Sequence, residues 1–384
     1  MNRLDDVRSI LSSLVAFDTT SRRSNLDLIA WTEAFLDPWA TSVIRLPSRD
    51  GLKANLWARF GPDEPGGWVL SGHTDVVPVD GQPWETDPWT LTERSGRLYG
   101  RGASDMKGFL ALCLAHARQF SGRPLKRPVH FAFSYDEEVG CAGVGPMIEQ
   151  IIMRGAAPSV VWVGEPTLWN VVSAHKGVRV YDVVVTGKDA HSSNPALGAS
   201  AIHEALELLV TLRGIARQAE MSPVADPTFE PAYPTLTIGA ISGGTAANIL
   251  ARECRFTFDL RSTPDVDPDE LLMPFFDQVH RSRERLSVHG PECGVTVQMN
   301  ADAPGLGRRG DSEAERLLRL LTGDNAVRSV AYATEAGLFQ QAGLSSVICG
   351  PGSIDQAHQP NEFLAVSELE RGFQIFDRFL GIVS

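Results

Sequence analysis

Apolar runs that end in charged or imidazole side chains recur along the first 176 residues of the chain. In segment 66–79, GGWVLSGHTDVVPV, such a run places His73 and Asp75 two residues apart, so a strand would direct both to the same face. Further patterns follow in the order 105–120 (helix), 127–138 (strand), 143–155 (helix) and 157–167 (strand). This alternation predicts an α/β fold, a mixed sheet with helices on both faces, with its chemistry at the carboxyl ends of the strands.

The middle of the chain has a different pattern. Strand-like and helix-like segments follow one another in the order 178–187 (strand), 195–217 (helix), 233–244 (strand), 254–263 (strand), 267–285 (helix) and 294–300 (strand). The order β-α-β-β-α-β is that of a compact ferredoxin-like unit. We therefore expect a separate domain at 178–300, inserted into a first domain formed by 1–177 and 301–384.

Length and composition narrow the classes of protein. A chain of 384 residues exceeds the usual size of one domain, which agrees with two. Its 35 basic and 47 acidic residues give a net charge of −12, which argues against nucleic acid as a partner. The absence of an 18-residue apolar run in the sequence argues against a membrane span.

The N-terminus and the cysteines indicate the compartment. Residues 1–15 have leucine and valine at helical spacing between charges, which is typical of an amphipathic surface helix rather than a signal peptide. The five cysteines are scattered and form no CxxC motif, so reduced thiols in a cytoplasmic protein are the simplest interpretation.

The strand ends supply a set of metal-ligand side chains. After His73 the chain places acids or imidazoles at Asp105, Glu137, Glu138, Glu165 and His358. Each alone has an ordinary explanation; Asp105, for instance, could cap the helix that follows it. With His73 included and the adjacent Glu137 and Glu138 counted as one position, five oxygen or nitrogen donors without a thiol indicate zinc or a similar divalent ion. Because a catalytic site uses about three protein ligands, five donors with one shared carboxylate would serve two metals.

Other chemistries fit less well. In GRGASD an aspartate, Asp105, stands where a dinucleotide-binding motif needs its third glycine. The sequence contains no GxSxG, HExxH or Walker-type motif. The other histidines stand outside the set of strand-end acids and imidazoles. They are interpreted as structural or surface residues: His116, His130, His203, His280 and His289.

The motifs SGHTDVVP, YGRGASDMKG, DEEVG and GEPT follow one another along the chain. With them the sequence resembles the di-zinc aminoacylase, carboxypeptidase and desuccinylase family over nearly its whole length. The segments DMKGFLAL, AHKG, HSSNPALGASAI and GPGSIDQAHQPNE are most similar to the branch that deacetylates N-acetyl amino acids of arginine biosynthesis.

The resemblance implies a role for each strand-end residue. One Zn²⁺ or Co²⁺ ion would be held by His73, Asp105 and Glu165, and a second by Asp105, Glu138 and His358. Asp105 would bridge the two ions, and its peptide bond to Met106 would be cis. Asp75 would orient the His73 ring, and Glu137 would act as general base and then as general acid.

The same resemblance makes the inserted domain a lid that joins two subunits in a homodimer. His191 would stabilise the oxyanion in the partner's active site. Asn248 and Arg261 would bind the substrate, and Arg261 would pair with the α-carboxylate of the substrate. The alternatives are a monomer with His191 in its own site or on the lid surface, a turn role for Asn248 and a surface ion pair for Arg261. Lys176, Glu335 and the Gly352 backbone are further candidates for the pocket wall.

These roles imply a metal-dependent amidohydrolase that deacetylates N-acetyl-L-ornithine or N-acetyl-L-citrulline. One alternative keeps the chemistry but changes the substrate, as in a succinyl-diaminopimelate desuccinylase or a carboxypeptidase. Another is a metal-binding or regulatory protein of the same fold without catalysis, against which the presence of Glu137 and all five ligands argues.

Overall fold

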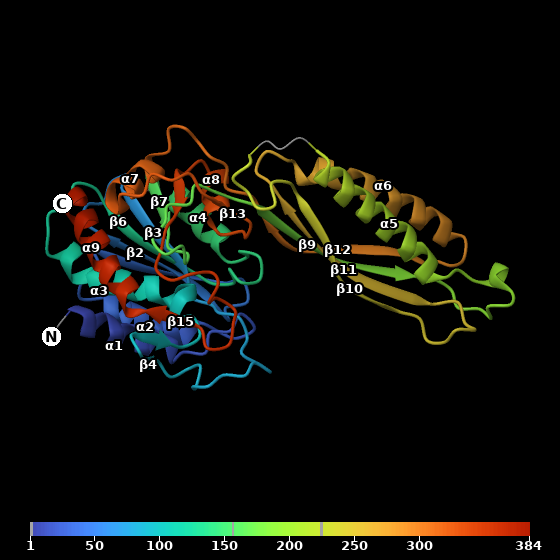
Figure 1. The fold of residues 1–384 in the computed structure, drawn as a ribbon, viewed down its shortest axis with the longest axis horizontal. Coiled ribbons are helices and arrows are strands. Elements are labelled where there is room, and N and C mark those ends of the chain that lie inside the picture. Colours follow the sequence, from blue (N-terminus) through green and yellow to red (C-terminus); the bar gives the residue numbers. More distant parts are fainter. Residues whose placement is uncertain (1–2, 156, 223–225) are drawn as a thin grey trace. The chain divides into compact units, whose positions relative to one another are not determined.

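The computed structural model describes residues 3–155, 157–222 and 226–384 (Figure 1). Two compact units are formed, and the first two residues of the expected N-terminal helix lie outside the described residues. Unit 1 comprises Met1–Ala174, Leu306–Ser329 and Thr334–Ser384, and unit 2 comprises His175–Gly305 and Val330–Ala333. None of the described helices is both long and apolar enough to cross a membrane.

Unit 1 is built on a six-stranded mixed sheet with the strand order β1-β2-β6-β3-β7-β14. The strands are β1 (Ser42–Pro47), β2 (Ala54–Phe60), β3 (Trp68–His73), β6 (Val129–Ser134), β7 (Val160–Val163) and β14 (Ser346–Ile348). Strands β6, β3, β7 and β14 run parallel, whereas β1 and β2 are antiparallel additions at one edge. The carboxyl ends of the four parallel strands therefore meet at one edge of the sheet.

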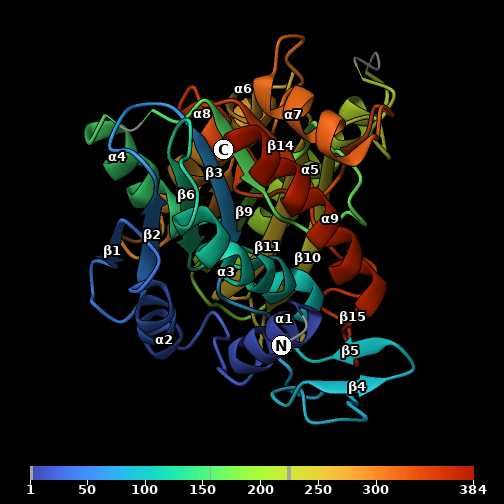
Figure 2. The same cartoon turned by 90° about the vertical axis from the view of Figure 1, so that its left-hand side faces the viewer.

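Helices cover both faces of this sheet, as the sequence pattern predicted. On one face, α1 (Arg3–Val15), α3 (Gly108–Ser121) and α9 (Val366–Val383) pack against an apolar core that includes Leu70 and Phe131 (Figure 2). The other face is covered by α4 (Val144–Met153) and α8 (Ala336–Gln341). The remaining elements around this unit are α2 (Leu26–Leu36), β4 (Thr92–Arg94), β5 (Arg97–Tyr99), β8 (Ala174–His175), α7 (Glu313–Thr322), β13 (Ser329–Val330) and β15 (Phe363–Ala365).

Unit 2 is a four-stranded antiparallel sheet of order β10-β11-β9-β12 with two helices on one face (Figure 1). Along the chain its elements are β9 (Gly177–Thr186), α5 (Ala201–Glu220), β10 (Thr235–Gly243), β11 (Glu253–Ser262), α6 (Pro268–Ser287) and β12 (Gly294–Ala303). The apolar side chains of α5 and α6 form its core with alternate residues of β9 and β11.

The first helix of unit 2 begins later than the pattern at 195–217 predicted. A short 3-10 turn covers Pro195–Leu197, and Gly198 then takes an extended conformation that interrupts the helix. The α-helix begins only after Ser200, whose side chain accepts a hydrogen bond from the backbone N–H of His203. A proline at 195 can start either kind of turn, so apolar spacing alone placed the boundary too early.

Candidate metal centre

The predicted ligand residues of the parallel strands meet at the carboxyl edge of the unit 1 sheet. His73 is the last residue of β3, Glu137 and Glu138 follow β6, and Glu165 follows β7. His358 lies in the loop after β14. Since these strands are parallel neighbours, the chain delivers the side chains to one place although they are nearly 300 residues apart in sequence.

The carboxylate of Asp105 lies between the two imidazoles. Its Oδ1 is 3.0 Å from Nε2 of His73, and its Oδ2 is 3.3 Å from Nε2 of His358. The residue sits in a π-type turn, Ala103–Lys107, where its φ of −118° and ψ of 94° are not helical, and the Asp105–Met106 peptide bond is cis, as the resemblance implied. Asp105 is therefore part of a distorted turn rather than a simple helix cap.

One further carboxylate lies beside each imidazole. Oε1 of Glu165 is 3.9 Å from Nε2 of His73, and Oε2 of Glu138 is 3.0 Å from Nε2 of His358. Glu137 also belongs to this cluster, because ligand atoms of His73, Glu137 and Glu165 lie within 4.8 Å of one another. A second group within the same limit is His73, Asp105 and Glu138, so the two groups share His73, while Asp105 lies between the two imidazoles.

The charges of this cluster are unbalanced. Burial and the charge of Asp105 raise the pKa of Glu138 to about 7 and that of Glu165 well above its usual range. Burial opposes ionisation of Asp105 as well, but the two imidazoles outweigh it and lower the pKa of that carboxyl. Oε1 of Glu165 is buried and has no hydrogen-bond partner among the described residues. Such a buried concentration of acceptors fits divalent cations, which would pair with the carboxylates and occupy the open acceptor.

Asp75 connects His73 to the turn that carries the glutamates. Nδ1 of His73 donates to the backbone carbonyl of Asp75 at 2.9 Å and lies 3.6 Å from its carboxylate. That carboxylate accepts hydrogen bonds from the backbone N–H groups of Glu137 (3.1 Å) and Glu138 (3.2 Å). The hydroxyl of Ser21 donates to it at 2.7 Å. Asp75 therefore orients the imidazole through its backbone and fixes the glutamate turn through its side chain.

Glu362 holds the backbone of the Asp105 turn and was missed by sequence reasoning. Its carboxylate accepts hydrogen bonds from the backbone N–H groups of Gly102, Ser104 and Asp105 at 2.9–3.0 Å. Arg101 pairs with the same carboxylate at 2.8 Å, and both side chains are 1% exposed. The acid in QPNE at 359–362 was the only signal, and nothing in the sequence connects it to residues 260 positions earlier.

Other predicted residues of unit 1 surround the cluster. Burial and the acidic neighbours Glu138 and Glu335 raise the pKa of Glu137 well above its usual range, and Cys141 Sγ donates to its carboxylate at 3.4 Å. Burial likewise raises the pKa of Glu335 to about 7, and Ser71 donates to it at 3.4 Å. Gly352 has a φ of +80°, and a Cβ there would lie 2.2 Å from Oγ of Ser104, so the position requires glycine.

Within unit 2, the structure brings the His191 and Asn248 loops together. The backbone N–H of Ser192 donates to the carbonyl of Asn248 at 2.9 Å, and His191 pairs with Ile249 as an isolated β-bridge. The backbone N–H of Ser193 donates to Nδ1 of His191 at 3.2 Å, and its Oγ is 2.7 Å away. With Nδ1 accepting, Nε2 of this exposed ring carries the proton.

Two predicted substrate groups of unit 2 already have partners. Nε of Arg261 donates to both carboxylate oxygens of Asp259, at 3.0 and 3.1 Å, which leaves the two terminal nitrogens of the guanidinium for other contacts. Nζ of Lys176 donates to the carbonyl of Tyr233 at 2.6 Å. Burial and the charge of Arg261 lower the pKa of Lys176, so the two cations act on one another.

Comparisons with known proteins show the family of the chain. The family model described as peptidase family M20/M25/M40 matches residues 69–381. The chain is 36% identical to the acetylornithine deacetylase of Myxococcus xanthus, over 96% of this chain and 95% of that protein. It is 34% identical to the acetylornithine deacetylase of Pasteurella multocida, over 99% of both chains.

Solved structures share the fold. The M20 family metallo-carboxypeptidase Sso-CP2 from Sulfolobus solfataricus is similar with a TM-score of 0.76 at 18% identity, over 98% of both chains. The YXEP protein of Bacillus subtilis, described as a dinuclear metal binding peptidase from the M20 family, is similar with a TM-score of 0.65 at 14% identity, over 99% of this chain and 98% of that one.

Proposed function

The chain belongs to peptidase family M20/M25/M40, and on that premise we propose that it is a metal-dependent amidohydrolase of N-acetyl-L-amino acids. Its substrate is N-acetyl-L-ornithine or N-acetyl-L-citrulline, because full-length relatives at 34–36% identity are acetylornithine deacetylases. The observation that carries the proposal is the Asp105 carboxylate between the two imidazoles, with one further carboxylate beside each. Five buried, unpaired cysteine thiols agree with a cytoplasmic location.

Two divalent ions would be held by the residues around Asp105. His73, Asp105 and Glu165 would bind the first, and Asp105, Glu138 and His358 the second. The donors are oxygen and imidazole nitrogen, which suit Zn²⁺ and also accept Co²⁺. When bound, such ions supply Lewis-acid catalysis, because they polarise a carbonyl and lower the pKa of water.

Glu137 would move the protons of the reaction. Its carboxylate takes a proton from the water that attacks the acetyl carbonyl, and then gives it to the amine nitrogen as the C–N bond breaks. The products are acetate and the free amino acid. Its neighbour Glu138 contacts His358 and serves as a ligand, so the two adjacent acids have separate tasks.

Unit 2 would supply substrate contacts. Arg261 has two guanidinium nitrogens left by its bond to Asp259, and these suit the substrate's α-carboxylate, while Asn248 binds a further polar group. Lys176 in unit 2, and Glu335 and the Gly352 backbone in unit 1, are further candidates for substrate contacts. The N–H at Nε2 of His191 would stabilise the developing oxyanion.

The functional form would be a homodimer joined through unit 2, with His191 acting in the partner's site. The support is the exposed edge strand β10, which pairs with β11 on one side only and whose residues from Gly239 onward are exposed. Mixing inactive Glu137→Ala and His191→Ala subunits tests this arrangement. With random exchange about half the dimers are mixed, so about a quarter of wild-type activity should return. Exchange without any return of activity would exclude action across the interface.

Hydrolysis of four substrates with and without metal tests the proposed activity. We expect turnover of N-acetyl-L-ornithine or N-acetyl-L-citrulline well above that of N-succinyl-diaminopimelate and a dipeptide. Treatment with a chelator should abolish the activity, and Zn²⁺ or Co²⁺ should restore it. Activity that survives verified metal removal would refute the proposal. A preference for the succinylated substrate would show that the protein is a desuccinylase rather than a deacetylase.

A further inference from the structure

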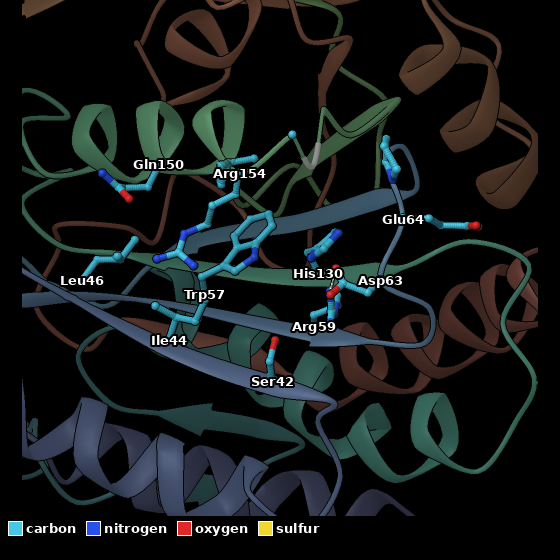
Figure 3. Close-up of a pocket in the computed structure, with 13 residues that line it drawn as sticks. Ser42, Ile44, Leu46, Trp57, Arg59, Asp63, Glu64, His130, Gln150 and Arg154 are labelled. Atoms are coloured by element: carbon cyan, nitrogen blue, oxygen red, sulfur yellow. Dashed lines mark hydrogen bonds and ion pairs between the residues drawn. The ribbon is translucent and has the colours of Figure 1, made fainter.

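A pocket lies in unit 1, away from the candidate metal centre. It has a volume of about 590 Å³ and is lined by residues of β1, β2, β6 and α4, together with the segment after β2 (Figure 3). Known sites for small molecules measure roughly 300–1,000 Å³. The pocket is therefore large enough to hold one.

The strand register separates this pocket from the metal centre. On the same sheet face, Val69 of β3 pairs with His130, which lines the pocket, and His73 pairs with Ser134. His130 thus lies four residues from Ser134, a distance of about 13 Å along the strand at ~3.3 Å per residue. A molecule in the pocket would sit near the opposite end of the strands from His73.

His130 is the most unusual side chain of this pocket. The residue is 2% exposed, and neither ring nitrogen has a hydrogen-bond partner among the described residues. Its ring stacks on Trp57, with centroids 4.4 Å apart and an angle of 22° between the planes. Burial and the nearby charge of Arg59 lower the pKa of His130 to about 3, so the ring is neutral. A neutral imidazole offers one donor and one acceptor, and leaving both unused in the folded protein is unfavourable.

Two arginines, Arg59 and Arg154, and two acids, Asp63 and Glu64, bring charge to the pocket. Arg59 pairs with Asp63 through one terminal nitrogen, but its buried Nε has no partner within the described part of the chain. Arg154 extends from the end of α4 toward the indole of Trp57 (Figure 3). Its guanidinium forms no ion pair with any residue that the structure describes. Arg154 is therefore the cation of the pocket that is available to an acidic ligand.

Apolar side chains complete the wall. Ile44 and Leu46 of β1 and Ile151 of α4 line the pocket together with the Trp57 ring. A ligand that suits this wall has an apolar body, one anionic end and a polar group beside that end.

We propose that this pocket is a second ligand site, which binds a small carboxylate-bearing molecule with an apolar body. The carboxylate pairs with Arg154, the body lies against Trp57 and the aliphatic wall, and a hydroxyl or amide next to the carboxylate bonds to His130. The site is separate from the one in which the substrate would be hydrolysed, so its test does not depend on the proposed activity.

Three related probes test the proposal in the metal-loaded protein by ligand-observed NMR. They are 3-phenyllactate, which has the hydroxyl and the carboxylate, 3-phenylpropionate, which has only the carboxylate, and 3-phenylpropionamide, which has no charge. We expect 3-phenyllactate to bind most tightly and the amide at least about tenfold more weakly than its acid.

Variants assign the binding to this pocket. Arg154→Gln should weaken both carboxylates about tenfold or more, whereas Arg217→Gln, at an exposed arginine in the last turn of α5, should leave their Kd unchanged. His130→Phe keeps the ring stack and removes both nitrogens, so it should abolish the preference for 3-phenyllactate over 3-phenylpropionate. The same variant should raise Tm by roughly 2–4 °C, because two unpaired buried polar atoms are lost.

Several results would overturn the proposal. One is that no probe binds at millimolar concentration. Another is that both pocket variants leave the binding intact, because the carboxylates would then bind in the catalytic centre. A lower Tm for His130→Phe would show that the imidazole nitrogens are paired in the protein. Loss of a dimer in the Arg154→Gln variant, measured by sedimentation, would show that a second copy of the chain covers this face.

Discussion

The candidate metal centre of unit 1 and the predicted substrate residues of unit 2 differ in the partners of their polar groups. Around Asp105, buried carboxylates and imidazoles contact one another, and Glu165 Oε1 has no hydrogen-bond partner among the described residues. In unit 2, Arg261 pairs with Asp259, Lys176 with a backbone carbonyl and His191 with Ser193. Each of these side chains has a partner within its own unit.

The difference indicates what each region lacks. A buried group of acids is unfavourable unless a cation joins it, so the unit 1 cluster by itself points to metal. The unit 2 residues need nothing further for their stability, and their function therefore has to be tested through the reaction. Changes to the predicted metal ligands of unit 1 should affect metal binding and activity, whereas changes to the predicted substrate residues of unit 2 should affect activity alone.

The largest effect is expected at the adjacent acids of unit 1. Glu137→Gln removes the proton acceptor and should lower kcat by about 10²–10⁴-fold while metal content stays unchanged. Glu138→Gln should instead weaken the binding of one ion. Metal analysis and steady-state kinetics give the metal content and kcat of both variants. If Glu137→Gln lost metal and Glu138→Gln kept it, the roles of the two acids would be exchanged.

The next effect is expected at His191 of unit 2. His191→Ala removes the donor to the oxyanion and should lower kcat by about 10²–10³-fold. Because the side chain is exposed, metal content and Tm should equal those of the wild type. A variant that loses metal together with activity would contradict the distinction between the two regions.

A smaller effect is expected at Glu362, which holds the Asp105 turn. Glu362→Gln weakens its bonds to Arg101 and to the backbone, so Asp105 should be less well oriented and metal affinity should fall about 10–100-fold. Glu370→Gln, at an exposed residue of α9, serves as the control. Added metal should restore most of kcat in the Glu362 variant. An unchanged metal affinity would limit Glu362 to a structural role.

The smallest effect is expected at Asp259. Asp259→Asn loosens the ion pair that orients Arg261, a half-exposed interaction of the kind worth up to about 1 kcal/mol. The KM for the N-acetyl amino acid should rise about two- to fivefold, with kcat unchanged. A fall in kcat with constant KM would show that Arg261 does not act through binding of the substrate.

The sequence predicted that the candidate ligand side chains would meet because they follow a periodic pattern, and their roles as ligands stay predictions. His73, Glu138 and Glu165 stand at or just after the ends of parallel strands, and apolar runs make such strands recognisable. Strand alternation placed Asp75 on the His73 side, but its bonds to the Glu137–Glu138 backbone depend on the path of the turn. No spacing rule describes that path.

What could not be predicted depends on contacts between distant segments. Glu362 reaches the Asp105 turn across 257 positions, and the pairing of β15 with β5 brings the two segments together. The pocket at Trp57 and His130 requires the register of β2 on β6, which sequence periodicity leaves open. His130 was interpreted as a structural or surface residue because it lacks companions in sequence, whereas the fold supplies them.

Asp105 is expected to bridge two divalent ions. Anomalous scattering from crystals loaded with Zn²⁺ locates such ions. We expect two ions roughly 3.5–4 Å apart. One ion should contact His73 and Glu165, the other Glu138 and His358, and both should contact Asp105. A single ion at full loading, or an Asp105 carboxylate that touches only one of two ions, would contradict this expectation.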